Sequence, residues 1–231
     1  NISYNITDAI DDQIRTLNAI SEKYELPQTM ENLKNNFFIV TGTGCRMRYV
    51  HSDPMNNAAI IRISADGTYY EIIAEKNIKP TSELPSHLLI HNVILGKGRK
   101  IKTVIHTHPI ELVAMTHNSD FLGKDVLSKL LWSMIPETRA FCPKGVGIVP
   151  YALPGSMELA QKTVEQLDDY DVVLWEKHGA LAIGEDIIEA FDMIDTLTKS
   201  AKIYESACSM GFKPKGMSDE QMDELKRVFN L

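Results

Sequence analysis

Val104-Ile105-His106-Thr107-His108-Pro109 is the stretch from which the fold of this chain can be worked out. Its β-branched, apolar start and its closing proline are typical of a buried strand that stops at a sheet end. Side chains two residues apart on a strand project from one face, so the imidazoles of His106 and His108 should lie together. Such a pair suits a borderline-soft divalent metal, zinc above all. Two uncompensated imidazoles in an apolar strand would be costly, so we interpret them as metal ligands rather than core residues.

Apolar, β-rich runs bounded by turn residues place further strands around this one. These runs cover residues 1–6, 37–41, 58–64, 68–74, 146–150, 172–175 and 178–184. Asp66-Gly67 joins two of them and is the strongest short hairpin signal. Helical spacing predicts helices over 8–23, 83–96, 112–116, 126–134, 157–167 and 186–208, and a last helix from Ser218. The sequence therefore predicts an α/β fold, a mixed sheet with helices outside it.

Composition limits the class of protein. A chain of 231 residues with 44% hydrophobic and 24% charged residues is typical of one globular domain, here 1–231. The net charge of −7, without a Lys/Arg-rich run, argues against nucleic-acid binding. Three cysteines without a C-x-x-C pair favour a reducing cytoplasm. No apolar stretch approaches the ~20 residues that span a bilayer, so we expect a cytoplasmic protein without a membrane partner.

A third histidine, His178, follows an apolar strand and precedes Gly179, where the backbone can come close to a neighbour. Taken alone, a histidine at a sheet end is as often simply exposed as functional. Beside His106 and His108 it completes a set of three imidazoles. Three neutral nitrogen ligands with one open position form a catalytic rather than a structural zinc arrangement.

Glu83 opens a predicted helix and is the candidate acid/base. Because a carboxylate at a helix N-terminus is favoured by the dipole, a glutamate without a catalytic role fits the pattern equally well. Thr81 and Ser82, just before it, are hydroxyl donors beside free N–H groups, which suits a phosphate. Gly42-Thr43-Gly44 is a second phosphate candidate, although a turn of this kind is commonly only structural.

These residues together resemble the class II, zinc-dependent aldolases, a superfamily that includes the adducin heads, and the similarity runs almost end to end. It is carried by residues 38–44, 80–87, 104–108, 145–150, 173–179 and 194–201. The series Ser-Glu, His-x-His and His-Gly is specific to the superfamily. The Thr-Ser-Glu-Leu-Pro block at 81–85 and the strand 173–175 are most similar to the branch that cleaves rhamnulose 1-phosphate. The resemblance implies a three-layer αβα fold around a mixed, mainly antiparallel sheet.

The resemblance also implies a role for each matching residue. His106, His108 and His178 would ligate one zinc ion per subunit, and Glu83 would transfer the proton. The substrate and its phosphate would be contacted by Asn1, Thr43, Gly44, Thr81 and Ser82. Glu137, for which the pattern alone gives no signal, matches a second glutamate that reaches the site of a neighbouring subunit in a cyclic tetramer.

The implied reaction is retro-aldol cleavage of a ketose 1-phosphate to dihydroxyacetone phosphate and lactaldehyde. Zinc would act as a Lewis acid on the ketone oxygen and stabilise the enediolate, and Glu83 would return a proton to C3. No Schiff base is required, so no lysine is assigned a role.

Several alternatives stay open. Fuculose-phosphate aldolases and pentulose-phosphate 4-epimerases share the metal set. A non-catalytic, adducin-like binding module is a different class, and the three retained histidines argue against it. A His-x-His metallohydrolase on a (β/α)8 barrel is remote, because such barrels typically need ~250 residues and an eightfold alternation.

The start of the chain carries a further expectation. Asn1-Ile2-Ser3-Tyr4-Asn5-Ile6 alternates like a strand already under way and has no initiator Met. We expect upstream sequence to be missing, because members of the family carry an N-terminal helix and a Gly/Asn phosphate-binding turn before the position of Asn1.

Overall fold

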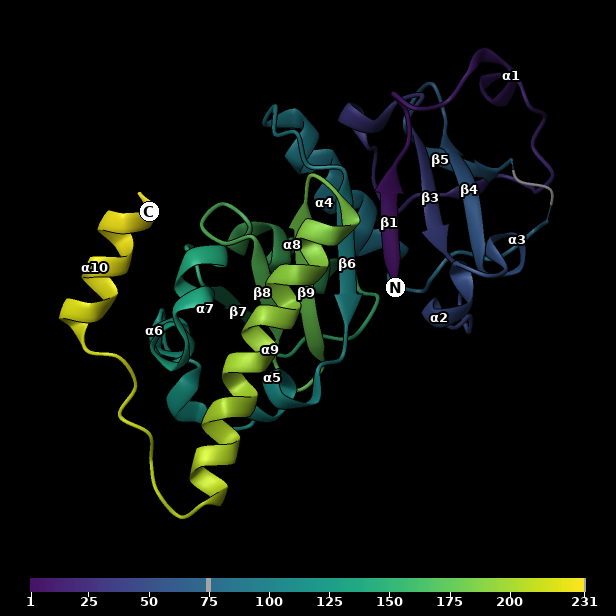
Figure 1. Ribbon diagram of the computed structural model, residues 1–231. Coiled ribbons are helices and arrows are strands. Elements are labelled where there is room, and N and C mark those ends of the chain that lie inside the picture. Colours follow the sequence, from purple (N-terminus) through teal and green to yellow (C-terminus); the bar gives the residue numbers. More distant parts are fainter. Residues whose placement is uncertain (74–75, 231) are drawn as a thin grey trace. The chain divides into compact units, whose positions relative to one another are not determined.

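A computed structural model describes residues 1–73 and 76–230 of the chain (Figure 1). The chain forms two compact units. The first comprises Asn1–Ile105, Ala152–Val164 and Gly184–Ile187, and the second His106–Tyr151, Glu165–Ile183 and Ile188–Leu231.

The first unit is built on antiparallel strands in the order β2-β5-β4-β3-β1-β6. The strands are β1 (Ile2–Asn5), β2 (Tyr24–Glu25), β3 (Phe37–Thr41), β4 (Ala58–Ile63), β5 (Tyr69–Ile72) and the first residues of β6 (Thr103–Thr107). Ser3 of β1 lies opposite Val40 on one side and Val104 on the other. Strand β1 therefore lies in the interior of this sheet, which fixes the position of the residues at its start.

The predicted hairpin is confirmed between β4 and β5. Gly67 adopts the left-handed conformation (φ +77°) that the turn requires. The carboxylate of Asp66 accepts hydrogen bonds from the hydroxyls of Ser64 and Thr68. The end of the predicted second strand, Ala74, lies outside the described residues.

One face of this sheet is covered by apolar side chains from helix α4 (Leu84–Gly96) and from the start of α8 (Met157–Gln166). The buried cluster comprises Met30, Leu33, Phe38, Val40, Ala59, Ile61, Ile63, Ile72, Leu84, Leu88, Leu89 and Ala160. Most of these positions follow the period of two in the strands and the period of 3.6 in α4, which is why their burial could be predicted. The core thus holds the first turn of α4 against β3.

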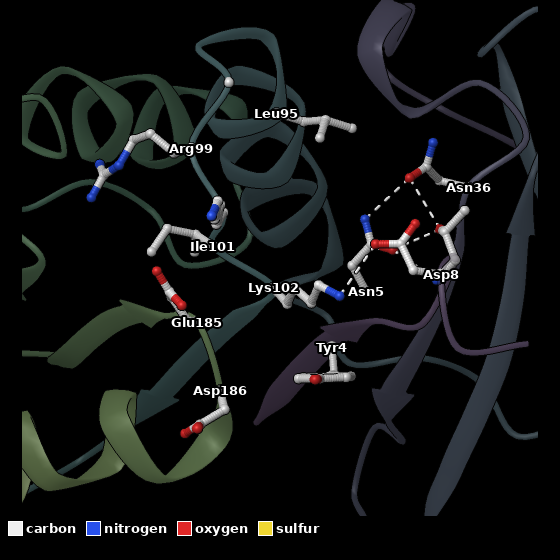
Figure 2. A pocket seen from close by; sticks show the side chains of 13 residues that line it. Tyr4, Asn5, Asp8, Asn36, Leu95, Arg99, Ile101, Lys102, Glu185 and Asp186 are labelled. Carbon is white, nitrogen blue, oxygen red and sulfur yellow. Dashed lines mark hydrogen bonds and ion pairs between the residues drawn. The ribbon is translucent and has the colours of Figure 1, made fainter.

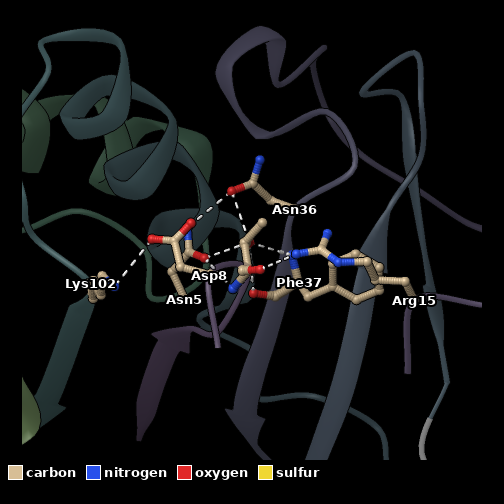
Figure 3. A network of polar contacts seen from close by, with 7 residues as sticks. Asn5, Asp8, Arg15, Asn36, Phe37 and Lys102 are labelled. Atoms are coloured by element: carbon tan, nitrogen blue, oxygen red, sulfur yellow. Dashed lines mark hydrogen bonds and ion pairs between the residues drawn. The ribbon is translucent and has the colours of Figure 1, made fainter. Parts of the chain in front are cut away.

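Polar contacts fix the C-terminal end of β1 (Figure 3). The amide of Asn5 donates to the side-chain oxygen of Asn36 (3.1 Å), and the hydroxyl of Thr7 donates to Asn5 (2.6 Å). The backbone N–H of Phe37 donates back to that hydroxyl (3.0 Å). These contacts set the register of β1 against β3, and hence the position of its first residues.

The second unit contains strands β7 (Val146–Val149), β8 (Val172–Trp175) and β9 (Gly179–Gly184, whose last residue belongs to the first unit). β8 is parallel to β7 and antiparallel to β9. All residues of β8 and β9 are buried, as expected for strands covered on both faces. The helices are α5 (Ile110–Met115), α6 (Val126–Met134), α7 (Pro136–Phe141), α9 (Ile187–Ser209, from Ile188 on) and α10 (Asp219–Phe229). The expected α/β class with a mixed, mainly antiparallel sheet is confirmed (Figure 1).

The predicted helix over 8–23 is wrong, because only α1 (Asp12–Arg15) is helical there. The side chain of Arg62 donates to the carbonyl of Leu17 (3.1 Å), and the N–H of Ile20 donates to Ile72 (2.9 Å). The segment therefore satisfies its backbone groups with strands β4 and β5, and apolar spacing alone could not indicate this competition.

Several short elements were not predicted. They are strand β2, helix α7 and the single turns α2 (Met47–Val50), α3 (Pro54–Asn57), η1 (Glu31–Leu33) and η2 (Ser119–Phe121). Short helices carry little periodicity, so they escape a pattern-based reading. Within 1–73 and 76–230, no helix combines the length and the apolar character needed to cross a membrane.

Candidate functional site

The second unit brings the three predicted histidines together. Nε2 of His106 lies 3.0 Å from Nε2 of His108. The ring of His178 lies 4.8 Å from the ring of His106 and 5.3 Å from that of His108, measured between centroids. One nitrogen from each ring lies within 4.8 Å of the others, so the set is able to hold a metal ion. Strand geometry predicted that His106 and His108 lie together. The approach of His178 to them depends on how the strands pack and could not be predicted from local geometry.

The three histidine rings are neutral, and this protonation state favours the binding of a metal cation. Nδ1 of His106 must donate to the carbonyl of Ala180 (3.0 Å), because a carbonyl only accepts, and this leaves the Nε2 lone pair facing His108. Burial lowers the pKa of both His108 and His178, which keeps their rings neutral. Nδ1 of His178 is buried and has no hydrogen-bond partner among the described residues. Neutral nitrogens with facing lone pairs are the donor set that a zinc-like ion accepts.

A tight turn between β8 and β9 carries His178. Lys177 occupies the left-handed region (φ +59°), and its N–H donates to the hydroxyl of Thr116 (2.8 Å). The N–H of His178 donates to the carbonyl of Trp175 (3.0 Å). The buried indole of Trp175 also lies against the rings of His106 (4.3 Å between centroids) and His178 (5.1 Å). The roles of Trp175 and Thr116 were not predicted, although a tryptophan three residues before a candidate ligand is a usable signal.

Gly179 is the residue that lets the rings approach the backbone. A Cβ at this position would meet Cε1 of His106 and the carbonyl of Thr107 at 2.6 Å, and Cδ2 of His108 at 2.8 Å. We expect Gly179→Ala to lower metal affinity by about tenfold or more, because it displaces two ligands. It should also cost about 1–3 kcal/mol of folding stability through overpacking. Metal titration and thermal unfolding would measure both effects.

Gly123→Ala is the matched control, since among the residues that the structure describes its Cβ would meet only Val126, at 3.1 Å. A Gly179→Ala variant that binds metal like the control would show that the rings are not held against this glycine.

Glu83 lies at the start of α4 in the first unit and is 5% exposed. One of its oxygens accepts the N–H of Gly155 (3.0 Å), a residue in the left-handed region (φ +75°). Burial raises the pKa of this carboxyl. The side chain of Glu83 makes no capping hydrogen bond to its own helix. The backbone N–H of Glu83 donates to the hydroxyl of Thr81 (3.3 Å). The purely capping interpretation of Glu83 thus loses support.

The two candidate phosphate segments lie side by side in the first unit. The N–H of Thr43 donates to the carbonyl of Lys79 (2.8 Å), and the N–H of Thr81 donates to Thr41 (2.9 Å). Thr43, Gly44 and Ser82 are exposed. A Cβ at Gly44 (φ +69°) would meet no atom of the described residues within 4 Å, so these residues leave the space beside this turn open. The turn and the segment before α4 thus form one polar surface.

Asn1 lies next to this surface. The N–H of Ile2 donates to the hydroxyl of Thr41 (2.9 Å), and Oδ1 of Asn1 lies 2.8 Å from Nε2 of the buried His87. His87 lies one helical turn after Glu83 on α4, and its role was not predicted. Its signal in the sequence is the spacing of four residues from the candidate acid/base.

Glu137 lies exposed in the first turn of α7 and is not a member of the histidine cluster. The resemblance placed it at a neighbouring subunit's site, and that role stays a prediction.

A cavity of about 830 Å³ in the first unit contains none of the predicted residues (Figure 2). Cationic and anionic side chains both line it, and Lys102 pairs with Asp8 there (3.2 Å). Its mixed charges do not favour one class of ligand.

The comparisons with known proteins agree with this geometry. Residues 15–204 match the family described as Class II Aldolase and Adducin N-terminal domain. A rhamnulose-1-phosphate aldolase of Bacteroides thetaiotaomicron is 54% identical over all of this chain and 86% of its own length. One from Klebsiella pneumoniae is 35% identical over 89% of this chain and 75% of its own length. The crystal structure of a sugar-phosphate aldolase from Thermotoga maritima superposes with a TM-score of 0.74 at 34% identity, covering 93% of this chain and 88% of that one. The predicted relationship is confirmed: the chain belongs to the family of class II aldolases and adducin N-terminal domains.

Proposed function

We propose that this chain is a zinc-dependent lyase that cleaves L-rhamnulose 1-phosphate to dihydroxyacetone phosphate and L-lactaldehyde, a step in rhamnose catabolism. The observation that carries the proposal is the similarity over the whole chain to a rhamnulose-1-phosphate aldolase at 54% identity. The histidine cluster supports it, because a binding module would have no use for three ligands arranged around one point.

His106, His108 and His178 are the residues that would hold the metal ion. Three neutral imidazoles leave a coordination position for substrate, which is the arrangement of catalytic zinc sites. When bound, zinc supplies Lewis-acid polarisation of the ketone oxygen. The Nδ1–H of His106, bonded to Ala180, keeps this ring in the tautomer whose Nε2 faces the cluster.

Glu83 is assigned the proton transfer. As the bond between C3 and C4 of the ketose breaks, its electron pair stays with the three-carbon fragment that carries the phosphate, and the C4 hydroxyl gives its proton to Glu83 as the aldehyde forms. Glu83 then returns a proton to C3, which gives dihydroxyacetone phosphate. Burial raises the pKa of this carboxyl, which makes the carboxylate a stronger base for the C4 hydroxyl proton. The N–H of Gly155 anchors one carboxylate oxygen and so orients the other.

The remaining assignments complete the proposal. Thr43, Gly44, Thr81 and Ser82 bind the phosphate through backbone and hydroxyl donors, and Asn1 contacts the substrate. Glu137 acts near the aldehyde end from a neighbouring subunit of a cyclic tetramer. We further propose that 1–231 is one class II aldolase domain and that the protein works in the cytoplasm.

A substrate panel with metal analysis tests this function. Zinc-loaded protein is expected to release dihydroxyacetone phosphate from L-rhamnulose 1-phosphate faster than from L-fuculose 1-phosphate, and to leave pentulose 5-phosphates unepimerised. Preference for either of the other substrates would assign the chain to another branch of the family. Stoichiometric zinc without any turnover would contradict the lyase, and absence of metal binding would favour the adducin-like module.

A further inference from the structure

A chain of buried polar side chains runs from α4 to Asn1 in the first unit. The hydroxyl of Ser3 lies 2.8 Å from Nε2 of His91 and 2.7 Å from Nδ1 of His87. Nε2 of His87 lies 2.8 Å from Oδ1 of Asn1. Ser3 and His87 are fully buried and His91 is 2% exposed, whereas Asn1 is only half-buried. This series of hydrogen-bonded side chains therefore leads from the core to the edge of the candidate substrate surface.

The hydrogen bonds run in one direction. An amide oxygen can only accept, so Nε2 of His87 must carry the proton, and Nδ1 of the same neutral ring must accept. The hydroxyl of Ser3 therefore donates to His87 and accepts from Nε2–H of His91. All three of these hydrogen bonds are made in this arrangement with both rings neutral. Burial lowers the pKa of both histidines, His91 to about 3, which keeps them neutral.

Packing of the core alone does not require these polar side chains. Leucine or phenylalanine would fill the same space without the cost of burying two imidazoles and a hydroxyl. His87 also lies on the rigid first turns of α4, where its N–H donates to the carbonyl of Glu83 (3.1 Å). The proposed acid/base and the end of the polar chain are thus carried by one element.

We propose that His91, Ser3 and His87 are positioning residues, which hold the carboxamide oxygen of Asn1 so that its N–H groups point away from His87 and donate to an oxygen of the sugar-phosphate substrate. This inference rests on the proposed function, since it gives Asn1 a substrate to bind. Without the chain, the two ends of the amide would exchange and present an acceptor to the substrate oxygen for part of the time.

A matched pair of variants at His87 tests this role. In His87→Asn, the side-chain amide takes the place of Nδ1, so it reaches Ser3 but not Asn1. In His87→Gln, the longer side chain places its amide where Nε2 was, so it reaches Asn1. We expect His87→Asn to raise KM for L-rhamnulose 1-phosphate by about tenfold, the loss of one hydrogen bond, with kcat within about twofold. His87→Gln should stay near the parent KM, and both should bind zinc fully.

A double-mutant cycle separates positioning from folding. If His87 acts through Asn1, adding His87→Asn to Asn1→Ala leaves KM unchanged beyond the effect of Asn1→Ala. The proposal would be overturned if the two substitutions multiplied each other's effect on KM. It would also be overturned if His87→Asn lowered the melting temperature and left KM unchanged.

Nitrogen-15 NMR of the unmutated protein gives a test that needs neither turnover nor a variant. Both His87 and His91 are expected as neutral rings protonated on Nε2. Protonation of His87 on Nδ1 would mean that Asn1 presents its nitrogen to His87, and would overturn the inference. If the protein fails to cleave the substrate, the proposed function falls, while the tautomers still decide the orientation of Asn1.

Discussion

His108→Ala is expected to lower zinc affinity and the rate of cleavage of L-rhamnulose 1-phosphate by more than about 100-fold each. Loss of a residue that merely orients a metal ligand already costs about 10–100-fold, and loss of a ligand itself should cost more. His108 is the suitable position, because it is the most exposed member of the cluster and its truncation leaves no fully enclosed cavity. Zinc content by mass spectrometry and release of dihydroxyacetone phosphate are the measurements.

His51→Ala serves as the control for this variant, since His51 is also exposed but lies outside the cluster. It should keep the zinc content and rate of the parent, and both variants should keep its melting temperature when metal has been removed. A His108→Ala protein that retains full zinc and full rate would exclude His108 as a metal ligand.

Glu83→Gln is expected to lower kcat by about 10²–10⁴-fold, the usual contribution of a positioned acid/base, without loss of zinc. The glutamine oxygen is able to accept the N–H of Gly155 as the carboxylate does, so the local structure should persist. Steady-state kinetics and zinc content on the same sample separate the proton-transfer role from metal binding. Unchanged kcat would exclude Glu83 as the acid/base, and a parallel loss of zinc would make it a ligand instead.

The same variant should change the pH dependence of stability. Burial raises the folded-state pKa of Glu83, so its contribution is fully present below the unfolded value of about 4.3 and is lost as pH rises through the folded value. In metal-free protein, Glu83→Gln should therefore gain melting temperature relative to the parent as pH rises from 4 to 8. Glu158→Gln, an exposed position on α8, should show no such gain. A constant difference across this range would contradict the raised pKa.

Sequence patterns predicted the fold well where local and tertiary preferences agree. Asp66-Gly67 forms the hairpin, and Ser218 caps α10 with a full capping box to Gln221. The segment 8–23 shows the opposite case. Its apolar spacing favoured a helix, but its backbone instead makes hydrogen bonds with the side chain of Arg62 and the carbonyl of Ile72. Local periodicity contains no information about such distant partners.

The candidate residues themselves could be predicted from sequence patterns: two imidazoles two residues apart at the end of a strand, a third at a turn, and a glutamate at a helix start. These follow from the fixed geometry of strands and helices. The folded chain was needed to show that His178 lies beside His106 and His108, and that buried Glu83 accepts the N–H of Gly155. It also revealed Trp175 and His87, whose contacts join residues far apart in the chain. Backbone periodicity is local, whereas burial and ring contacts depend on which elements pack together, and this is why only the folded chain could show them.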